Sequence, residues 1–228
     1  MKKLSLVFLI IFGLSGILTN VLKLELFFNV FLVLFIPFLT LYYSWSQKQR
    51  NKDLDRAILG ALFVLFLSDI LELSLFSGFC FKDKIQIVLH FIVQLLFLAV
   101  FKKEGAILVQ ESKVDILKIF VPAVIIFVIF GFFVFEESQI LNYVLLIIYT
   151  IILAILWILS MYRPINNYAY YTGVFGVSFL LLYGLFYFLF SYNTSIPSLY
   201  QISFGFYVFS EIFLVESFST STKTQKNE

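Results

Sequence analysis

GALFVLFLSDILELSLF (residues 60–76) and IQIVLHFIVQLLFLAVF (residues 85–101) are two apolar runs separated by a short loop, 77–84. At about 1.5 Å per helical residue, each run spans most of a hydrocarbon core approximately 30 Å thick. Neither run alternates apolar and polar residues with a period of two, which argues against a membrane barrel. The stretch therefore predicts two antiparallel transmembrane helices joined by a hairpin.

The composition of the whole chain points to the same class of protein. Of its 228 residues, 61% are hydrophobic and 13% are charged, with a mean hydropathy of +1.00. Such a chain cannot cover a soluble domain with a polar surface. A net charge of +2 with dispersed lysines excludes a nucleic-acid partner, and a single cysteine excludes an internal disulfide.

Apolar runs recur along the chain and predict an all-α, polytopic membrane bundle of eight transmembrane helices. The N-terminal run resembles a signal peptide, but no small-residue cleavage site follows it, so we expect a retained first helix. Residues 102–118 have an amphipathic pattern and are expected to lie at the membrane interface. We expect a single helical domain over 1–218 and a disordered cytoplasmic tail over 219–228. The predicted helices are 4–22, 26–43, 57–76, 85–101, 119–135, 140–162, 168–190 and 199–218.

The distribution of basic residues predicts the orientation of these spans. With a cytoplasmic N-terminus, every Lys and Arg except Lys23, Lys82 and Lys84 falls in a cytoplasmic segment. Cytoplasmic loops carry an excess of Lys and Arg. The pattern predicts that both termini are cytoplasmic, and we expect a bacterial cytoplasmic membrane.

Polar side chains interrupt the quoted runs, among them Ser68, Asp69, Glu72, His90 and Gln94. An ionisable residue in a membrane span costs about 2.5–3.5 kcal/mol on insertion scales, so it marks a functional site by default. Glu72 follows Asp69 by three residues and Gln94 follows His90 by four, so each pair shares a helix face. The hairpin permits a contact between Asp69 and His90.

Three interpretations of this polar seam remain open at the level of sequence. It can be a catalytic or ligand-binding site, a set of contacts that holds helices together, or part of a proton or ion path. Glu211 is expected near mid-membrane and facing the bundle, as a second carboxylate. The hydroxyls of Tyr183 and Tyr207 are expected to line a polar cavity or to pack.

The chain lacks the residues that several catalytic mechanisms require. The chain has no Gly-x-Ser-x-Gly motif, no second histidine for a zinc site and no glycine-rich phosphate loop followed by lysine. We therefore expect neither a metal nor another cofactor.

GALF (60–63) through LSD (67–69) is followed, in the next predicted helix, by LHFI (89–92). These short motifs resemble the paired G-A-L and A/S-H-L-L-Y signatures of the YhhN-like lysoplasmalogenase family of eight-helix membrane proteins. FIPF (35–38) resembles its Lys-Pro-Leu segment, and YVFSEIFLV (207–215) resembles its closing helix. Ile36 stands where the family has lysine, and Leu182 stands where a second motif would place aspartate.

The resemblance implies hydrolysis of the vinyl-ether bond of a lysoplasmalogen to a fatty aldehyde and a glycerophospho-base. It implies Asp69 as the principal acid or base, Glu72 or Glu211 as the partner carboxylate, and His90 as orienter or proton shuttle. The expected partner is a membrane lysophospholipid, bound by Ser68, Gln94, Tyr183 and Tyr207. The alternative is a non-enzymatic bundle, for lipid binding or small-molecule transport, in which the polar seam is structural.

Overall fold

The computed structural model describes residues 2–46, 52–76, 78–79, 81–108, 112–134, 140–192 and 198–221. Two predicted segments fall outside these ranges: the tail predicted over 219–228, from residue 222 onward, and the connection between the predicted helices 119–135 and 140–162. The middle of the basic loop between the second and third helices, 47–51, is outside them as well.

The described part of the chain is all-α, as predicted, and contains no strand. Within the described ranges, eight α-helices follow one another, with one 3₁₀ turn, η1, between the third and fourth. Their bounds are α1 Lys2–Val21, α2 Glu25–Ser46, α3 Lys52–Glu72, η1 Ser74–Phe76, α4 Lys82–Lys103, α5 Lys113–Val134, α6 Ile140–Ser160, α7 Asn167–Tyr192 and α8 Ser198–Thr220.

The third and fifth helices begin earlier than predicted. α3 already starts at Lys52, and its polar first turn had been assigned to the loop. α5 starts at Lys113, inside the segment that we expected to lie at the interface. There the Ser112 hydroxyl accepts from the Asp115 backbone N–H at 3.2 Å, and Asp115 Oδ2 accepts from the Ser112 backbone N–H at 3.2 Å. This reciprocal capping box satisfies two N–H groups and fixes the start of the helix.

Among the described residues, five helical segments are long and apolar enough to cross a membrane: Leu4–Val21, Glu25–Ser46, Lys84–Lys103, Asn167–Phe190 and Ser198–Thr220. Large apolar side chains also face outward, such as Phe127, which is 79% exposed, and Trp45, which is 78% exposed. An apolar outer surface of this kind suits lipid rather than water. The helices thus fit a multi-pass membrane protein.

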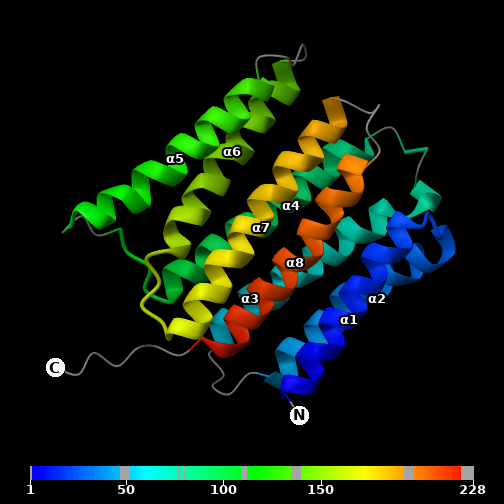
Figure 1. Cartoon of the computed structure of the whole chain (residues 1–228), viewed down its shortest axis with the longest axis horizontal. Helices are drawn as coiled ribbons and strands as arrows, with labels where there is room; N and C mark the ends of the chain where they lie inside the picture. Colours follow the sequence, from blue (N-terminus) through cyan, green and yellow to red (C-terminus); the bar gives the residue numbers. More distant parts are fainter. Residues whose placement is uncertain are drawn as a thin grey trace.

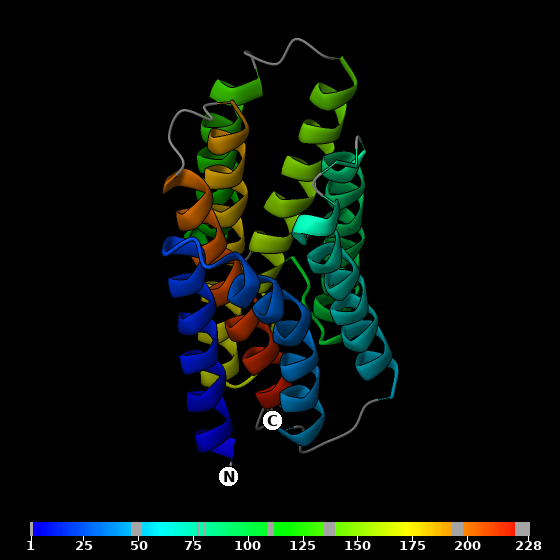
Figure 2. The same cartoon turned by 90° about the vertical axis from the view of Figure 1, so that its right-hand side faces the viewer.

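The helices lie roughly parallel and antiparallel to one another and are inclined to the long axis of the molecule (Figure 1). α5 and α1 lie at opposite edges, and α7 and α8 run side by side between them (Figure 1). A view turned by 90° shows that α1 begins and α8 ends at the same end of the bundle (Figure 2). Gly176 allows the close approach of α7 to α8, because a Cβ there would lie 2.9 Å from the backbone nitrogen of Leu214.

A buried arginine locks the end of the bundle at which α4 and α8 finish. Arg163, in the turn between α6 and α7, donates from Nε to Glu104 Oε2 at 2.6 Å and from Nη1 to Ser217 Oγ at 2.8 Å. Its guanidinium carbon lies 4.4 Å from the centroid of the Phe101 ring. These contacts hold α4, the α6–α7 turn and α8 together. The polar seam lies toward the opposite end of the bundle, where α3 joins α4.

Candidate functional site

Between α3, α4, α7 and α8 lies a small cavity with a volume of about 60 Å³. A cavity of this size has room for water. Both polar and apolar side chains line it: Leu32, Ser68, Asp69, Glu72, Gln86, Ile87, His90, Tyr149, Tyr183, Gly184, Tyr187, Phe188, Tyr200, Ser203, Phe204 and Tyr207.

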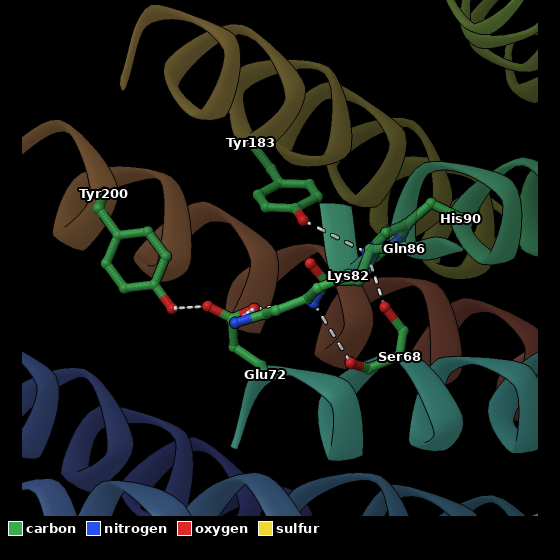
Figure 3. Close-up of polar contacts among 7 residues, drawn as sticks. All are labelled: Ser68, Glu72, Lys82, Gln86, His90, Tyr183 and Tyr200. Atoms are coloured by element: carbon green, nitrogen blue, oxygen red, sulfur yellow. Dashed lines mark hydrogen bonds and ion pairs between the residues drawn. The ribbon is translucent and has the colours of Figure 1, made fainter. Parts of the chain in front are cut away.

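Glu72, the last residue of α3, is held by three partners (Figure 3). Its Oε1 accepts from the Tyr200 hydroxyl at 2.7 Å, and its Oε2 accepts from Gln86 Nε2 at 2.7 Å. Lys82 Nζ lies 3.2 Å from the same Oε2, and the Glu72 side chain is 23% exposed. The carboxylate therefore sits at the border of the interior, oriented by α4 and α8 together.

His90 lies one helical turn after Gln86 and meets two hydroxyls through a single ring nitrogen. Ser68 Oγ and the Tyr183 hydroxyl both lie 3.3 Å from His90 Nε2 (Figure 3). Gln86 Nε2 also reaches the Ser68 carbonyl at 3.4 Å, which joins this group to Glu72. The arrangement forms a polar path from the partly exposed Glu72 to the half-buried imidazole.

Asp69 is hydrogen-bonded to a residue outside the α3–α4 hairpin. Its Oδ1 accepts from the Tyr207 hydroxyl of α8 at 2.7 Å, and both residues are buried. The other oxygen, Oδ2, has no hydrogen-bond partner among the described residues. The permitted hydrogen bond between Asp69 and His90 is thus absent, because each side chain turns to a tyrosine of a different helix.

Two predicted site residues do not line the cavity. Gln94 and Glu211 lie deeper in the bundle and are 1% and 0% exposed. The Glu211 carboxylate is close enough to Asp69 for their charges to interact, and Ser210 Oγ lies 3.5 Å from its Oε1. Ser68, Asp69, Glu72, His90, Tyr183 and Tyr207 do line the cavity.

Three further residues that shape the site were not proposed from the sequence. Gln86 stands four residues before His90, so helical spacing alone could have placed it on the same face. Lys82 had been assigned only to the loop, although its charge is a recognisable partner for Glu72. Tyr149 of α6 carries no sequence signal that separates it from a packing residue.

Chemically, the site offers two carboxyl groups, an imidazole and several hydroxyls, shielded from bulk water. Such a set can move protons and stabilise a transient positive charge. No group of three or more acidic, histidine or cysteine side chains able to hold a metal ion occurs in the described ranges.

Comparison of the chain with protein-family models, with curated proteins and with solved structures yields no match. The candidate function therefore depends on the chemistry of the side chains themselves.

Proposed function

We propose that this protein is a lysoplasmalogenase-like membrane hydrolase, which cleaves the vinyl-ether bond of a lysoplasmalogen. The observation that carries the proposal is that Asp69, Glu72 and His90 line one cavity inside an apolar bundle. The short motifs around Asp69 and His90 that resemble the YhhN-like family support the same activity. The products are a fatty aldehyde and a glycerophospho-base.

The proposed reaction begins with a proton. Asp69, held by the Tyr207 hydroxyl, protonates the vinyl carbon that does not carry the ether oxygen, and the other carbon becomes part of an oxocarbenium cation. The nearby carboxylate of Glu72 stabilises this cation. Water adds to the cationic carbon and gives up a proton, and the resulting hemiacetal splits into the aldehyde and the glycerol hydroxyl.

His90 has the proposed role of proton shuttle in this sequence. It contacts Ser68 and Tyr183, whose hydroxyls can relay the proton lost by the attacking water. The cavity of about 60 Å³ has room for the attacking water. The alkenyl chain approaches from the bilayer, with Phe188 and Phe204 as its apolar wall.

The proposal includes a topology with eight spans and both termini in the cytoplasm of a bacterial cell. The bias of Lys and Arg toward one side supports this orientation. Glu72 and Lys82 then lie toward the outer leaflet, where the lysophospholipid headgroup would sit.

The test is aldehyde release from a 1-alkenyl lysophospholipid by the full chain in lipid nanodiscs. We expect turnover of this lipid and none of its 1-acyl ester counterpart. Asp69→Asn should lower the rate of aldehyde release by about 10²–10⁴-fold, which is the usual contribution of general acid catalysis. Asp53→Asn, an exposed carboxylate in the first turn of the same helix, is the matched control and keeps full activity. An inactive wild type, or an unchanged rate in Asp69→Asn, would overturn the proposal.

The small cavity also favours a second candidate, a non-enzymatic bundle in which the polar seam holds helices together. Glu72 and His90 already have partners inside the protein, and such contacts contribute about 0.6–2 kcal/mol each in membranes. This candidate predicts no aldehyde release, together with reduced stability of Asp69→Asn. A transport role would instead appear as solute flux across sealed vesicles.

A further inference from the structure

Lys82 is the basic residue that the structure places beside the candidate site. It is the first residue of α4, and its Nζ lies 3.2 Å from Glu72 Oε2 (Figure 3). Glu72 lines the cavity of about 60 Å³ together with Gln86 and Tyr200. Lys82 therefore lies next to the cavity and is connected to its wall through Glu72.

The position of Lys82 along α4 places it at the border of the membrane. The segment of α4 that is apolar enough to cross a membrane begins at Lys84. The Lys82 side chain is 19% exposed, so it is accessible from outside the bundle. Long basic side chains at the ends of membrane spans extend toward the phospholipid headgroups.

The ammonium group of Lys82 has hydrogen-bonding capacity that Glu72 does not use. A lysine ammonium carries three donors, and the described residues give its side chain one partner, Glu72 Oε2. Glu72 also accepts hydrogen bonds from Tyr200 and Gln86, so its orientation does not depend on Lys82 alone. Lys82 can therefore bind a second anion while Glu72 keeps its place.

We infer that Lys82 binds the phosphate of the lysophospholipid headgroup and is the residue that selects a phospholipid as substrate. The inference rests on the proposed hydrolase function. Lysine binds phosphate as a point charge. The positive end of the α4 dipole, which begins at this residue, adds to the attraction of an anion.

A phosphate held at this point would set the position of the lipid in the site. In a lysoplasmalogen only the glycerol carbons separate the phosphate from the vinyl ether, so an anchor beside Glu72 keeps the vinyl ether near the cavity. A lipid with the same alkenyl chain but no phosphate lacks this anchor. Because Lys82 acts on substrate binding rather than on proton transfer, its loss should raise KM more than it lowers kcat.

The first experiment compares two substrates of the full chain in nanodiscs: a 1-alkenyl lysophosphoethanolamine and the 1-alkenylglycerol that lacks the phosphate. In the wild type, kcat/KM should be at least about 10-fold higher for the phospholipid, the discrimination that a hydrogen bond between charged groups supplies. Lys82→Met and Lys82→Gln should each abolish this preference by raising KM for the phospholipid. Lys82→Arg keeps the charge and should retain the preference.

Lys84→Met is the matched control. Lys84 is an exposed lysine of the same helix, and a separation of two residues places it on a different face from Lys82. This variant should keep the wild-type preference for the phospholipid. An equal loss of preference in Lys84→Met and Lys82→Met would overturn the inference, because the effect would then come from the charge of the surface in general.

Binding of an inert lipid separates this inference from the proposed reaction. A tritiated 1-alkyl lysophosphoethanolamine has a saturated ether, so its binding to the full chain in detergent micelles, compared with that of the 1-alkylglycerol, requires no turnover. The wild type should bind the phospholipid more tightly, and Lys82→Met should not. This result without aldehyde release from any lipid would refute the hydrolase and support the role of Lys82.

The opposite outcome is equally distinct. If the wild type releases aldehyde but binds the two inert lipids alike, or if Lys82→Met binds them with the wild-type preference, the role of Lys82 is refuted and the hydrolase proposal stands.

Discussion

Replacing Tyr207 by phenylalanine isolates the contact that connects α8 to the acid of α3. The substitution keeps the ring, which packs 5.4 Å from the Tyr183 ring and 6.2 Å from the Phe35 ring, and removes only the hydroxyl. Asp69 then loses its single hydrogen bond of 2.7 Å while it stays buried. The expected effect is a less stable bundle whose packing is otherwise unchanged.

Two ranges of contact energies set the expected coupling energy between Tyr207 and Asp69. Polar contacts between membrane helices average about 0.6 kcal/mol and reach about 1.7 kcal/mol in double-mutant cycles. A hydrogen bond to a charged group contributes about 1.5–3 kcal/mol in soluble proteins. Because this bond is short and both groups are buried, we expect a coupling of about 1–2 kcal/mol, in the region where the two ranges meet.

The assay is reversible unfolding in mixed micelles for the wild type, Tyr207→Phe, Asp69→Asn and the double variant. Tyr171→Phe, which removes a hydroxyl from a residue with 59% exposure, should change the free energy of unfolding very little. Effects of the two site variants that add within about 0.3–0.5 kcal/mol would refute the reasoning, because residues in contact do not add.

Two further predictions concern the other polar contacts. Glu104→Ala should lower the free energy of unfolding by about 3–5 kcal/mol, because Arg163 then stays buried without a paired carboxylate. In the same micelle assay, the double variant Glu104→Leu/Arg163→Met should recover much of that loss. Hydrogen bonds from the N-cap serine and the charge of Lys118 hold the pKa of Asp115, in the polar first turn of α5, below its usual value of 3.8. The ionised carboxylate therefore stabilises the helix start above the usual pKa of 3.8, and this stabilisation is lost as the pH falls through the lower pKa of the folded state. The protection factors of the amides in this turn should fall below about pH 4. Ser112→Ala should weaken this pH dependence, and wild-type protection factors that do not change with pH would contradict the prediction.

Much of the helical framework could be predicted from hydropathy, because a run of apolar residues in a membrane must satisfy its backbone hydrogen bonds within a helix. The starts of α3 and α5 could not, since their first turns are polar and resemble loops. At Lys113 the helix start is set by the reciprocal bonds of Ser112 and Asp115, which a hydropathy pattern does not reveal.

Some residues of the candidate site could likewise be predicted from the sequence, and others could not. Asp69, Glu72 and His90 could be identified from sequence because charged and imidazole groups are costly in apolar runs. Tyr149 and Lys82 were missed because a tyrosine in a helix and a lysine in a loop are common without any role at a site.

The sequence by itself predicted an all-helical, apolar chain that suits a membrane, and it showed which side chains are expensive to bury there. Only the tertiary structure decided their partners: Tyr207 for Asp69, and Tyr183 and Ser68 for His90. Helical spacing relates residues within one helix and a short loop relates two neighbouring helices. Contacts between α3 and α8, far apart in the chain, depend on how all the helices pack.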